Sequence, residues 1–269
     1  MIYTNVVIYH ANCADGFGAA WAAWKVLKDA AIYLPVQYGE EPPYQQCEGK
    51  AVCIVDFSYP KEMLLRLDDC ANGLAVLDHH KTAQRDLDGL SFATFDMDHS
   101  GAMLAWKYFH HDSAPPLFIE YIQDRDLWQW ALPQSREVSA ALHSYPYEFS
   151  VWDDLSMNVN QLRLEGVVLL RAKDQLVKRM ADHAVVGNVG GHQVHIVNAT
   201  VFFSEVGEEL CLRYPDEPFA AYYFDRTDRR QWGLRSRGDF DCSVVATLYG
   251  GGGHPGAAGF TTLKSDLSV

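Results

Sequence analysis

Short apolar runs recur in the first third of the chain, and each stops abruptly at a polar residue. Runs of four or five apolar residues without polar alternation are typical of strands buried on both faces of a parallel sheet. The predicted strands of this kind are 6–10, 31–36, 51–55 and 74–77. Apolar residues at helical spacing separate them, in predicted helices at 17–25 and, after a cap at Ser58, at about 60–69. The alternation predicts an α/β fold with a mainly parallel sheet flanked by helices.

The rest of the chain predicts a second, smaller α/β domain. Residues 39–49, with two prolines, are a predicted surface loop. Further predicted helices are 100–110, 117–122, 204–213 and 240–249, and further predicted strands are 194–197, 220–224 and 232–236. A mostly helical stretch separates the two groups. We therefore expect a catalytic domain at 1–150, a helical connector at 151–185 and a C-terminal domain at 186–269.

Composition and charge limit the partners. The chain has 269 residues, 48% of them hydrophobic, and a net charge of −13. Affinity for long nucleic acids comes mainly from Lys and Arg, so we expect no binding to a long duplex. No apolar stretch is long enough to span a bilayer, and no signal peptide is visible, so we expect no membrane partner. The six scattered cysteines fit a reducing, cytoplasmic location.

Acids and histidines stand at the ends of three predicted strands. His10 ends the first, Asp56 follows the third, and Asp78, His79 and His80 follow the fourth. Ligands of open α/β sheets bind beyond the carboxyl ends of the strands. An isolated Asp-His-His triplet would more often be a polar loop that begins a helix, but three such strand ends together favour a metal site.

Mixed Asp and His ligands suit Mn²⁺, Fe²⁺ or Co²⁺. We expect two divalent ions, Mn²⁺ first, with Co²⁺ or Mg²⁺ as alternatives, because two metals that share a carboxylate can activate water for attack on phosphorus. Asp56 is the expected bridge, with His10 on one metal. The expected ligands of the other are Asp15, His79 and Asp124, and Asp78 is a further expected metal ligand. Asp126 is the alternative to Asp124 as a ligand. Both acids belong to a polar cluster with Arg125, Trp128 and Trp130. By itself, that cluster would equally well be an exposed, salt-bridged helix end. His79 is the expected ligand of the histidine pair, and catalysis is assigned to His79 and His80.

The glycine run near the C-terminus predicts a second site. Successive backbone N–H groups of Gly251, Gly252 and Gly253 could form a concave anion nest. His254 adds a donor, and Arg235 and Arg237 on the preceding strand supply guanidinium groups that match phosphate. A flexible linker is the alternative. We expect Arg235, Gly251, Gly252, Gly253 and His254 to bind the substrate.

These segments together resemble the DHH–DHHA1 phosphoesterase family. The matching segments are 10–16, 55–56, 78–80, the region of Asp124 and Asp126, and 250–260. The last, Gly-Gly-Gly-His followed by Ala-Ala-Gly-Phe, is similar to the signature of the DHHA1 domain. The resemblance implies an N-terminal DHH domain, two Mn²⁺-type ions and a C-terminal DHHA1 domain that holds the substrate. One motif differs, because only Asp15 stands where the family usually has two acids after the histidine, with Asn12 or Cys13 near the other position.

The expected function is therefore a phosphodiesterase. We expect hydrolysis of short linear oligonucleotides or dinucleotides, such as pGpG, to mononucleotides. One alternative is a phosphohydrolase of a nucleotide phosphomonoester, a polyphosphate or a dinucleoside polyphosphate. Another is a catalytically silent nucleotide-binding module, suggested by the missing acid. The aromatic residues do not decide, because Trp and Tyr serve equally as core residues and as base-stacking platforms. A homodimer is left open.

Overall fold

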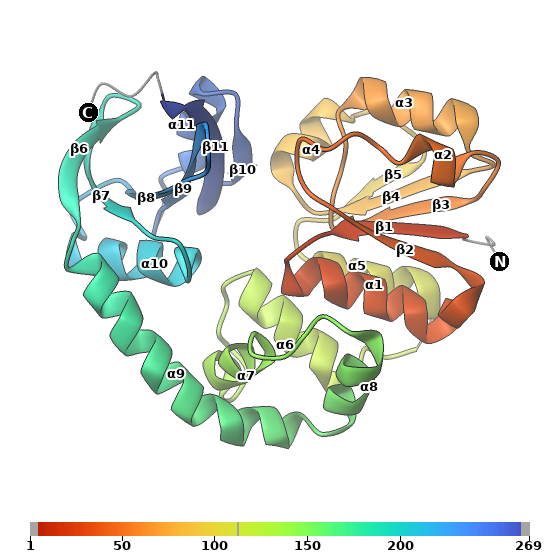
Figure 1. Cartoon of the computed structure of the whole chain (residues 1–269), viewed down its shortest axis with the longest axis horizontal. Helices are drawn as coiled ribbons and strands as arrows, with labels where there is room; N and C mark the ends of the chain where they lie inside the picture. Colours follow the sequence, from red (N-terminus) through yellow and green to blue (C-terminus); the bar gives the residue numbers. More distant parts are fainter. Residues whose placement is uncertain (1–4, 112, 265–269) are drawn as a thin grey trace. The chain divides into compact units, whose positions relative to one another are not determined.

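The computed structural model describes residues 5–111 and 113–264, and the chain divides into two compact units, Met1–Leu170 and Arg171–Val269 (Figure 1). Each unit has its own sheet with packed apolar side chains on both faces. The division falls inside the long helix α9 (Val159–Ala181), which lies within the predicted connector 151–185.

The first unit is built on a fully parallel sheet of order β2-β1-β3-β4-β5. Its strands are β1 (Val6–His10), β2 (Ile32–Val36), β3 (Val52–Val55), β4 (Leu74–Asp78) and β5 (Ala93–Phe95). The predicted parallel α/β fold is confirmed. The sequence did not predict β5, which has only three residues and no continuous apolar run.

Helices cover both faces of this sheet (Figure 1). On one face Val7 of β1 packs with α1 (Ala14–Leu27), α5 (Gly101–His110), α6 (Leu117–Asp126), α7 (Ser135–Leu142) and α8 (Phe149–Met157). On the other face Val6 and Ile8 pack with α2 (Tyr44–Cys47) and α3 (Lys61–Cys70). Neighbouring strand residues point to opposite faces, so burial of both faces requires the continuous apolar runs seen in the sequence. The remaining elements are the 3₁₀ turn η1 (Lys28–Ala30) and α4 (Lys81–Asp86).

Two local predictions were wrong. The predicted loop 39–49 contains α2, because Cys47 is fully buried and anchors that helical turn. Ser58 does not cap α3, whose cap position is Pro60; its hydroxyl instead donates a hydrogen bond to Asp78. The stretch after residue 150 is mostly helical, as predicted, with a break at Asn158 that separates α8 from α9.

The second unit has a mixed sheet of order β10-β11-β9-β8-β7-β6, in which only β7 and β8 are parallel. Its strands are β6 (Val185–Val189), β7 (His192–Asn198), β8 (Ala220–Asp225), β9 (Arg229–Arg235), β10 (Gly252–His254) and β11 (Ala257–Leu263). Helix α10 (Phe203–Arg213) packs on one face, and α11 (Cys242–Leu248) packs on the other. This unit is the smaller α/β part that the sequence predicted.

Two absences concern only the parts of the chain that the structure describes. None of their helices is both long and apolar enough to cross a bilayer. All six cysteines lie in these parts, and each is a free thiol.

Candidate metal centre

The carboxyl edge of the parallel sheet collects the acids and histidines of the first unit. Strand β1 ends at His10, β3 leads directly into Asp56, and β4 ends at Asp78. Because β1, β3 and β4 are parallel neighbours, these ends lie side by side. The backbone N–H of Asp56 donates to the carbonyl of Leu77, which ties the Asp56 turn to β4.

His79 is the centre of a cluster of three carboxylates, two of them buried. Its Nε2 lies 3.1 Å from Asp56 Oδ1, 3.6 Å from Asp15 Oδ2 and 3.6 Å from Asp126 Oδ2. Asp15, Asp56 and His79 are each only 2% exposed. Ligand atoms of these three residues all lie within 4.8 Å of one another, which is a spacing that one metal ion could span.

Asp56 also belongs to a second group. His10, Cys13 and Asp56 bring an imidazole nitrogen, a thiol sulfur and a carboxylate oxygen within 4.8 Å of one another. His10 Nδ1 is 3.7 Å from Asp56 Oδ2, whereas His79 approaches the other oxygen, Oδ1. Asp56 therefore faces both groups, one with each carboxylate oxygen. Its backbone has φ +56°, a conformation that is uncommon for non-glycine residues, although less so for Asp, and that is frequent at active sites.

Close backbone approach fixes this arrangement. The backbone N–H groups of Gly101 and Ala102, at the start of α5, donate to Asp15 at 2.6 and 3.0 Å. The N-terminus of a helix favours a negative charge, so α5 holds Asp15 in place. A side chain on Gly101 would place its Cβ 2.3 Å from the Cβ of Asp56. The sequence analysis missed Gly101, and the Ser-Gly pair that begins α5 was its only signal.

Asp78 lies in neither of these two ligand groups, and its expected role as a metal ligand stays a prediction. Its Oδ1 accepts hydrogen bonds from the backbone N–H of His79 at 2.7 Å and from that of His80 at 3.3 Å, and it lies 2.7 Å from His80 Nδ1. Its Oδ2 accepts from the Ser58 hydroxyl. Asp78 is fully buried, and its hydrogen bonds with these donors stabilise the turn that follows β4. We therefore propose Asp78 as the residue that positions His80.

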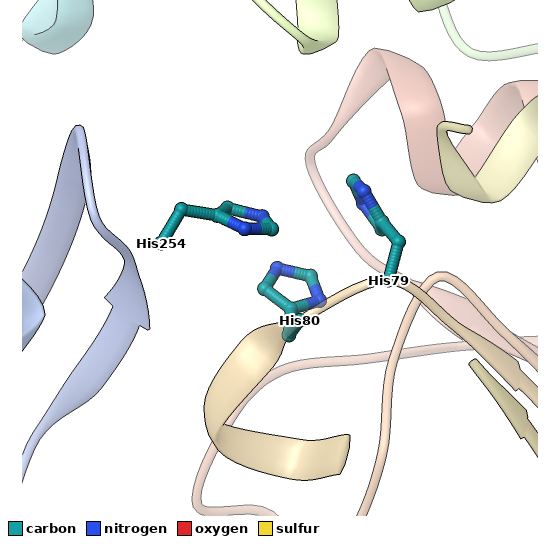
Figure 2. Close-up of side chains that lie close together, drawn as sticks. All are labelled: His79, His80 and His254. Carbon is teal, nitrogen blue, oxygen red and sulfur yellow. The ribbon is translucent and has the colours of Figure 1, made fainter. Parts of the chain in front are cut away.

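The rings of His79 and His80 project from the turn between β4 and α4 (Figure 2). Their centroids are 4.8 Å apart and the rings are inclined at 61°. His79 is buried within the carboxylates, while His80 has 20% of its side chain exposed and pairs with Asp78. The two histidines thus differ in their surroundings, and their chemical roles stay predictions.

Asp126, rather than Asp124, faces His79. Asp124 is 3% exposed, and its two oxygens accept the backbone N–H groups of Ala131 and Leu132 at 2.8 and 3.3 Å. It organises the loop that follows α6. Residues two apart on a helix point about 200° away from each other, so only one of the two acids can face the sheet edge. This moves our ligand proposal from Asp124 to Asp126.

Asp126→Asn and Asp124→Asn should therefore fail differently. Asp126→Asn removes one carboxylate charge from the cluster, and we expect metal affinity to fall at least tenfold with an unchanged melting temperature. Asp124→Asn sets an amide N–H₂ against a backbone N–H, so we expect a loss of about 1–3 kcal/mol in the free energy of unfolding. Metal titration and thermal unfolding of both variants measure the difference. If Asp124→Asn instead bound metal more weakly while its free energy of unfolding was unchanged, Asp124 would be a metal ligand after all.

The electrostatics of the cluster fit a cation. Burial and the charges of Asp126 and Asp56 raise the pKa of Asp15 well above its ordinary value. Burial also raises the pKa of Asp126. Although burial acts to lower it, the contact with Asp56 and the charges of the three carboxylates raise the pKa of His79 to about 10. For Asp56 the contacts with His10 and His79 outweigh burial and keep its pKa below the ordinary value.

Carboxylates crowded in this way hold protons unless another cation balances them. The donors are carboxylate oxygens and imidazole nitrogens, with the Cys13 thiol at one side, which suits a first-row divalent ion. The residues present therefore fit the metal ions that the sequence predicted. His10, Cys13 and Asp56 would hold one ion, and Asp15, Asp56, His79 and Asp126 would hold another.

The predicted anion nest of the second unit stays a prediction, although part of the glycine run has other hydrogen-bond partners. The backbone N–H groups of Gly250 and Gly251 donate to the carbonyls of Thr247 and Ala246, so they complete the end of α11. Gly252 and Gly253 belong to β10, which pairs with β11. A Cβ on Gly251 would lie 2.1 Å from the carbonyl oxygen of Gly259, so this glycine allows the strands to pack closely. Close strand pairing explains the glycine run better than a loop with free N–H groups.

Arg235 and His254 are nevertheless brought to one row of the sheet. Ala257 of β11 is paired with Arg235 on one side and with His254 on the other. Residues directly opposite each other on antiparallel strands place their side chains on the same face. Arg235 and His254 are thus two strands, about 10 Å, apart, with Ala257 on the strand between them. His254 lies at the end of β10 (Figure 2). Arg237, also expected near this site, lies beyond β9 and pairs weakly with Glu208 at 4.0 Å.

Comparison with known proteins finds two with similar sequences. No protein-family model matches the chain. The uncharacterized protein R106 of Acanthamoeba polyphaga mimivirus is 32% identical over 295 aligned residues, which cover 98% of this chain and 69% of that protein. Oligoribonuclease NrnB of Bacillus subtilis (strain 168) is 24% identical over 290 residues, which cover 94% of this chain and 71% of NrnB.

Solved structures share the fold at low sequence identity. The DHH domain of PF0399, described as a member of a family of ribosomal proteins, has a TM-score of 0.61 at 12% identity, over 97% of this chain and 82% of that chain. The pGpG-specific phosphodiesterase PggH from Vibrio cholerae has a TM-score of 0.51 at 12% identity, over 98% and 94%. With its parallel sheet, its Asp and His residues at the strand ends and these relatives, the chain belongs to the DHH–DHHA1 phosphoesterase family of hydrolases.

Proposed function

We propose that this protein is a metal-dependent phosphodiesterase that cleaves short linear oligonucleotides to mononucleotides, with dinucleotides such as pGpG as its first substrates. The observation that carries the proposal is the sharing of Asp56 by two groups of potential metal ligands. One carboxylate that faces two cation positions is the arrangement a two-metal phosphoesterase needs. The likeness to an oligoribonuclease supports an oligonucleotide substrate.

Two divalent ions would polarise the scissile phosphate and supply a water molecule of lowered pKa as the nucleophile. Mn²⁺ is our first expectation, and Co²⁺ and Mg²⁺ are the alternatives. The protein would contribute the geometry. Asp56 would be fixed by its tie to β4, Asp15 by the start of α5, and His79 by its carboxylates. His80, oriented by Asp78 and more exposed than His79, would hold a proton near the phosphate or the leaving oxygen.

The second unit would bind the substrate through the row that holds Arg235 and His254. Arg235 offers a guanidinium group, and His254 a ring nitrogen, on one face of the sheet. Gly251, Gly252 and Gly253 would then serve by bringing β10 close to β11, which sets the position of His254. Such a row would take one phosphate group. We accordingly expect His254→Ala to raise the KM for a dinucleotide.

Substrate length tests the proposed function. The chain carries a net charge of −13, so each nucleotide added beyond the first phosphates should bring repulsion rather than a new contact. We expect kcat/KM with Mn²⁺ to fall at least tenfold from 5′-phosphorylated dinucleotides to decanucleotides. Duplex should be nearly inert, and salt should lower the activity only mildly.

The measurement is product analysis over two to ten nucleotides at two salt concentrations, with metal content determined on the same preparation. Nucleotide phosphomonoesters, inorganic polyphosphate and dinucleoside polyphosphates serve as rival substrates. Faster turnover of one of these would replace the proposed substrate within the same reaction class. A preparation that binds no divalent metal and cleaves none of them would show a silent nucleotide-binding module.

A further inference from the structure

The loop after α6 has two tryptophans in an unusual backbone conformation. Trp128 has φ +57° and Trp130 has φ +53°. Bulky residues in this left-handed region are rare and cost free energy, and they persist where the surroundings impose them, often at functional sites. The loop itself is held firmly, because the carboxylate and the backbone carbonyl of Asp124 both accept hydrogen bonds from backbone N–H groups of the loop.

Core packing does not account for this conformation. Both indoles are only half-buried, and neither belongs to the two apolar cores of the first unit. Instead, they stand edge to face at 4.9 Å, each with an arginine against it. The guanidinium of Arg125 lies 4.9 Å from the Trp128 ring centre, and that of Arg136 lies 4.4 Å from the Trp130 ring centre. We call these four residues the tryptophan–arginine platform.

The platform adjoins the metal centre. Asp126, whose carboxylate faces His79, is the last residue of α6, and Trp128 follows two residues later. Two residues of chain span at most about 7 Å, so the platform begins within one nucleotide's reach of the ligand cluster. Flat aromatic and guanidinium surfaces bind nucleobases by stacking, with little dependence on base identity.

We infer that the tryptophan–arginine platform is a stacking site for the nucleobase next to the scissile phosphate. The inference rests on the proposed function and assigns its substrate class more narrowly, because the enzyme would then require a base and not only a phosphodiester. The strained backbone would turn the indoles out of the core and towards the substrate. The arginines would add charge beside an otherwise acidic cluster.

The test compares a dinucleotide with the same dinucleotide lacking one base. Both substrates carry the same phosphates, so their difference isolates stacking. We expect the wild type to prefer the complete substrate by about tenfold to a hundredfold in kcat/KM. Trp128→Gly and Trp130→Gly suit the test, because glycine accepts the positive φ without strain. At least one of them should lose most of the preference through KM while keeping its activity on the abasic substrate, and Trp128→Phe should retain the preference.

Trp24→Ala is the matched control. Trp24 is also half-buried with a cation on its ring, Lys28 at 3.3 Å, but it lies nine residues along α1 from Asp15, about 13 Å away. The inference would be overturned if both glycine variants kept the full preference for the complete dinucleotide, or if Trp24→Ala lost that preference to the same extent.

Quenching of tryptophan fluorescence by adenosine 5′-monophosphate, compared with ribose 5-phosphate, gives a readout without hydrolysis. If the wild type cleaves neither dinucleotide, the proposed function fails. Base-dependent quenching that Trp128→Gly or Trp130→Gly abolishes would still support the stacking site, and equal quenching by both compounds would refute it.

Discussion

Asp56→Asn is expected to abolish turnover, with at least a hundredfold loss in kcat, while the fold remains intact. Asp56 is the one residue shared by the two potential ligand groups, and each of its oxygens faces a different histidine. Asn has nearly the same size, so the packing around this buried position is kept. Its amide nitrogen cannot ligate a cation, and it removes the charge that would balance two dications.

The measurement is kcat on a dinucleotide together with bound metal per chain. Asp69→Asn, a change at an exposed acid on α3, is the control and should behave as wild type. If Asp56→Asn keeps more than about a tenth of the wild-type rate, a loss below about 1.4 kcal/mol, Asp56 does not bridge two metals.

Gly101→Ala is expected to damage the metal centre almost as strongly, although Gly101 has no side chain to contribute. The new Cβ would lie 2.3 Å from Asp56 Cβ and 2.7 Å from its Oδ1, which is far inside van der Waals contact. Either Asp56 or the start of α5 must move. Because the N–H of Gly101 also holds Asp15, a shift of α5 would displace that second acid. We expect at least a tenfold loss of metal affinity and a larger loss of kcat.

Gly166→Ala separates this effect from general destabilisation. Its Cβ would lie 1.9 Å from the carbonyl oxygen of Glu137, so the clash is at least as severe, but it falls between α9 and α7. We expect this control to lower the melting temperature while the folded protein still binds metal. Equal metal affinity in Gly101→Ala and the wild type would show that the close approach of α5 does not position Asp56.

The sequence determined the sheet and the edge on which the site lies. Strands buried on both faces must be apolar throughout, so the runs at 6–9, 51–55 and 74–77 predicted buried strands of a parallel sheet. The residue that ends such a strand must lie at the carboxyl edge. His10 and Asp56 could therefore be assigned to one place without any knowledge of the helices.

Tertiary structure decided which acids face the cluster. Asp124 and Asp126 are equally plausible in sequence, and only the rotation of α6 against the sheet turns Asp126 to His79 and Asp124 to the following loop. Asp78 ends its strand as expected, but Ser58 and the backbone of its own turn take up its oxygens. Gly101 matters only because α5 packs against the end of a strand that lies far earlier in the chain. Local pattern fixes where a strand ends, whereas the direction of a side chain depends on contacts between residues far apart in sequence.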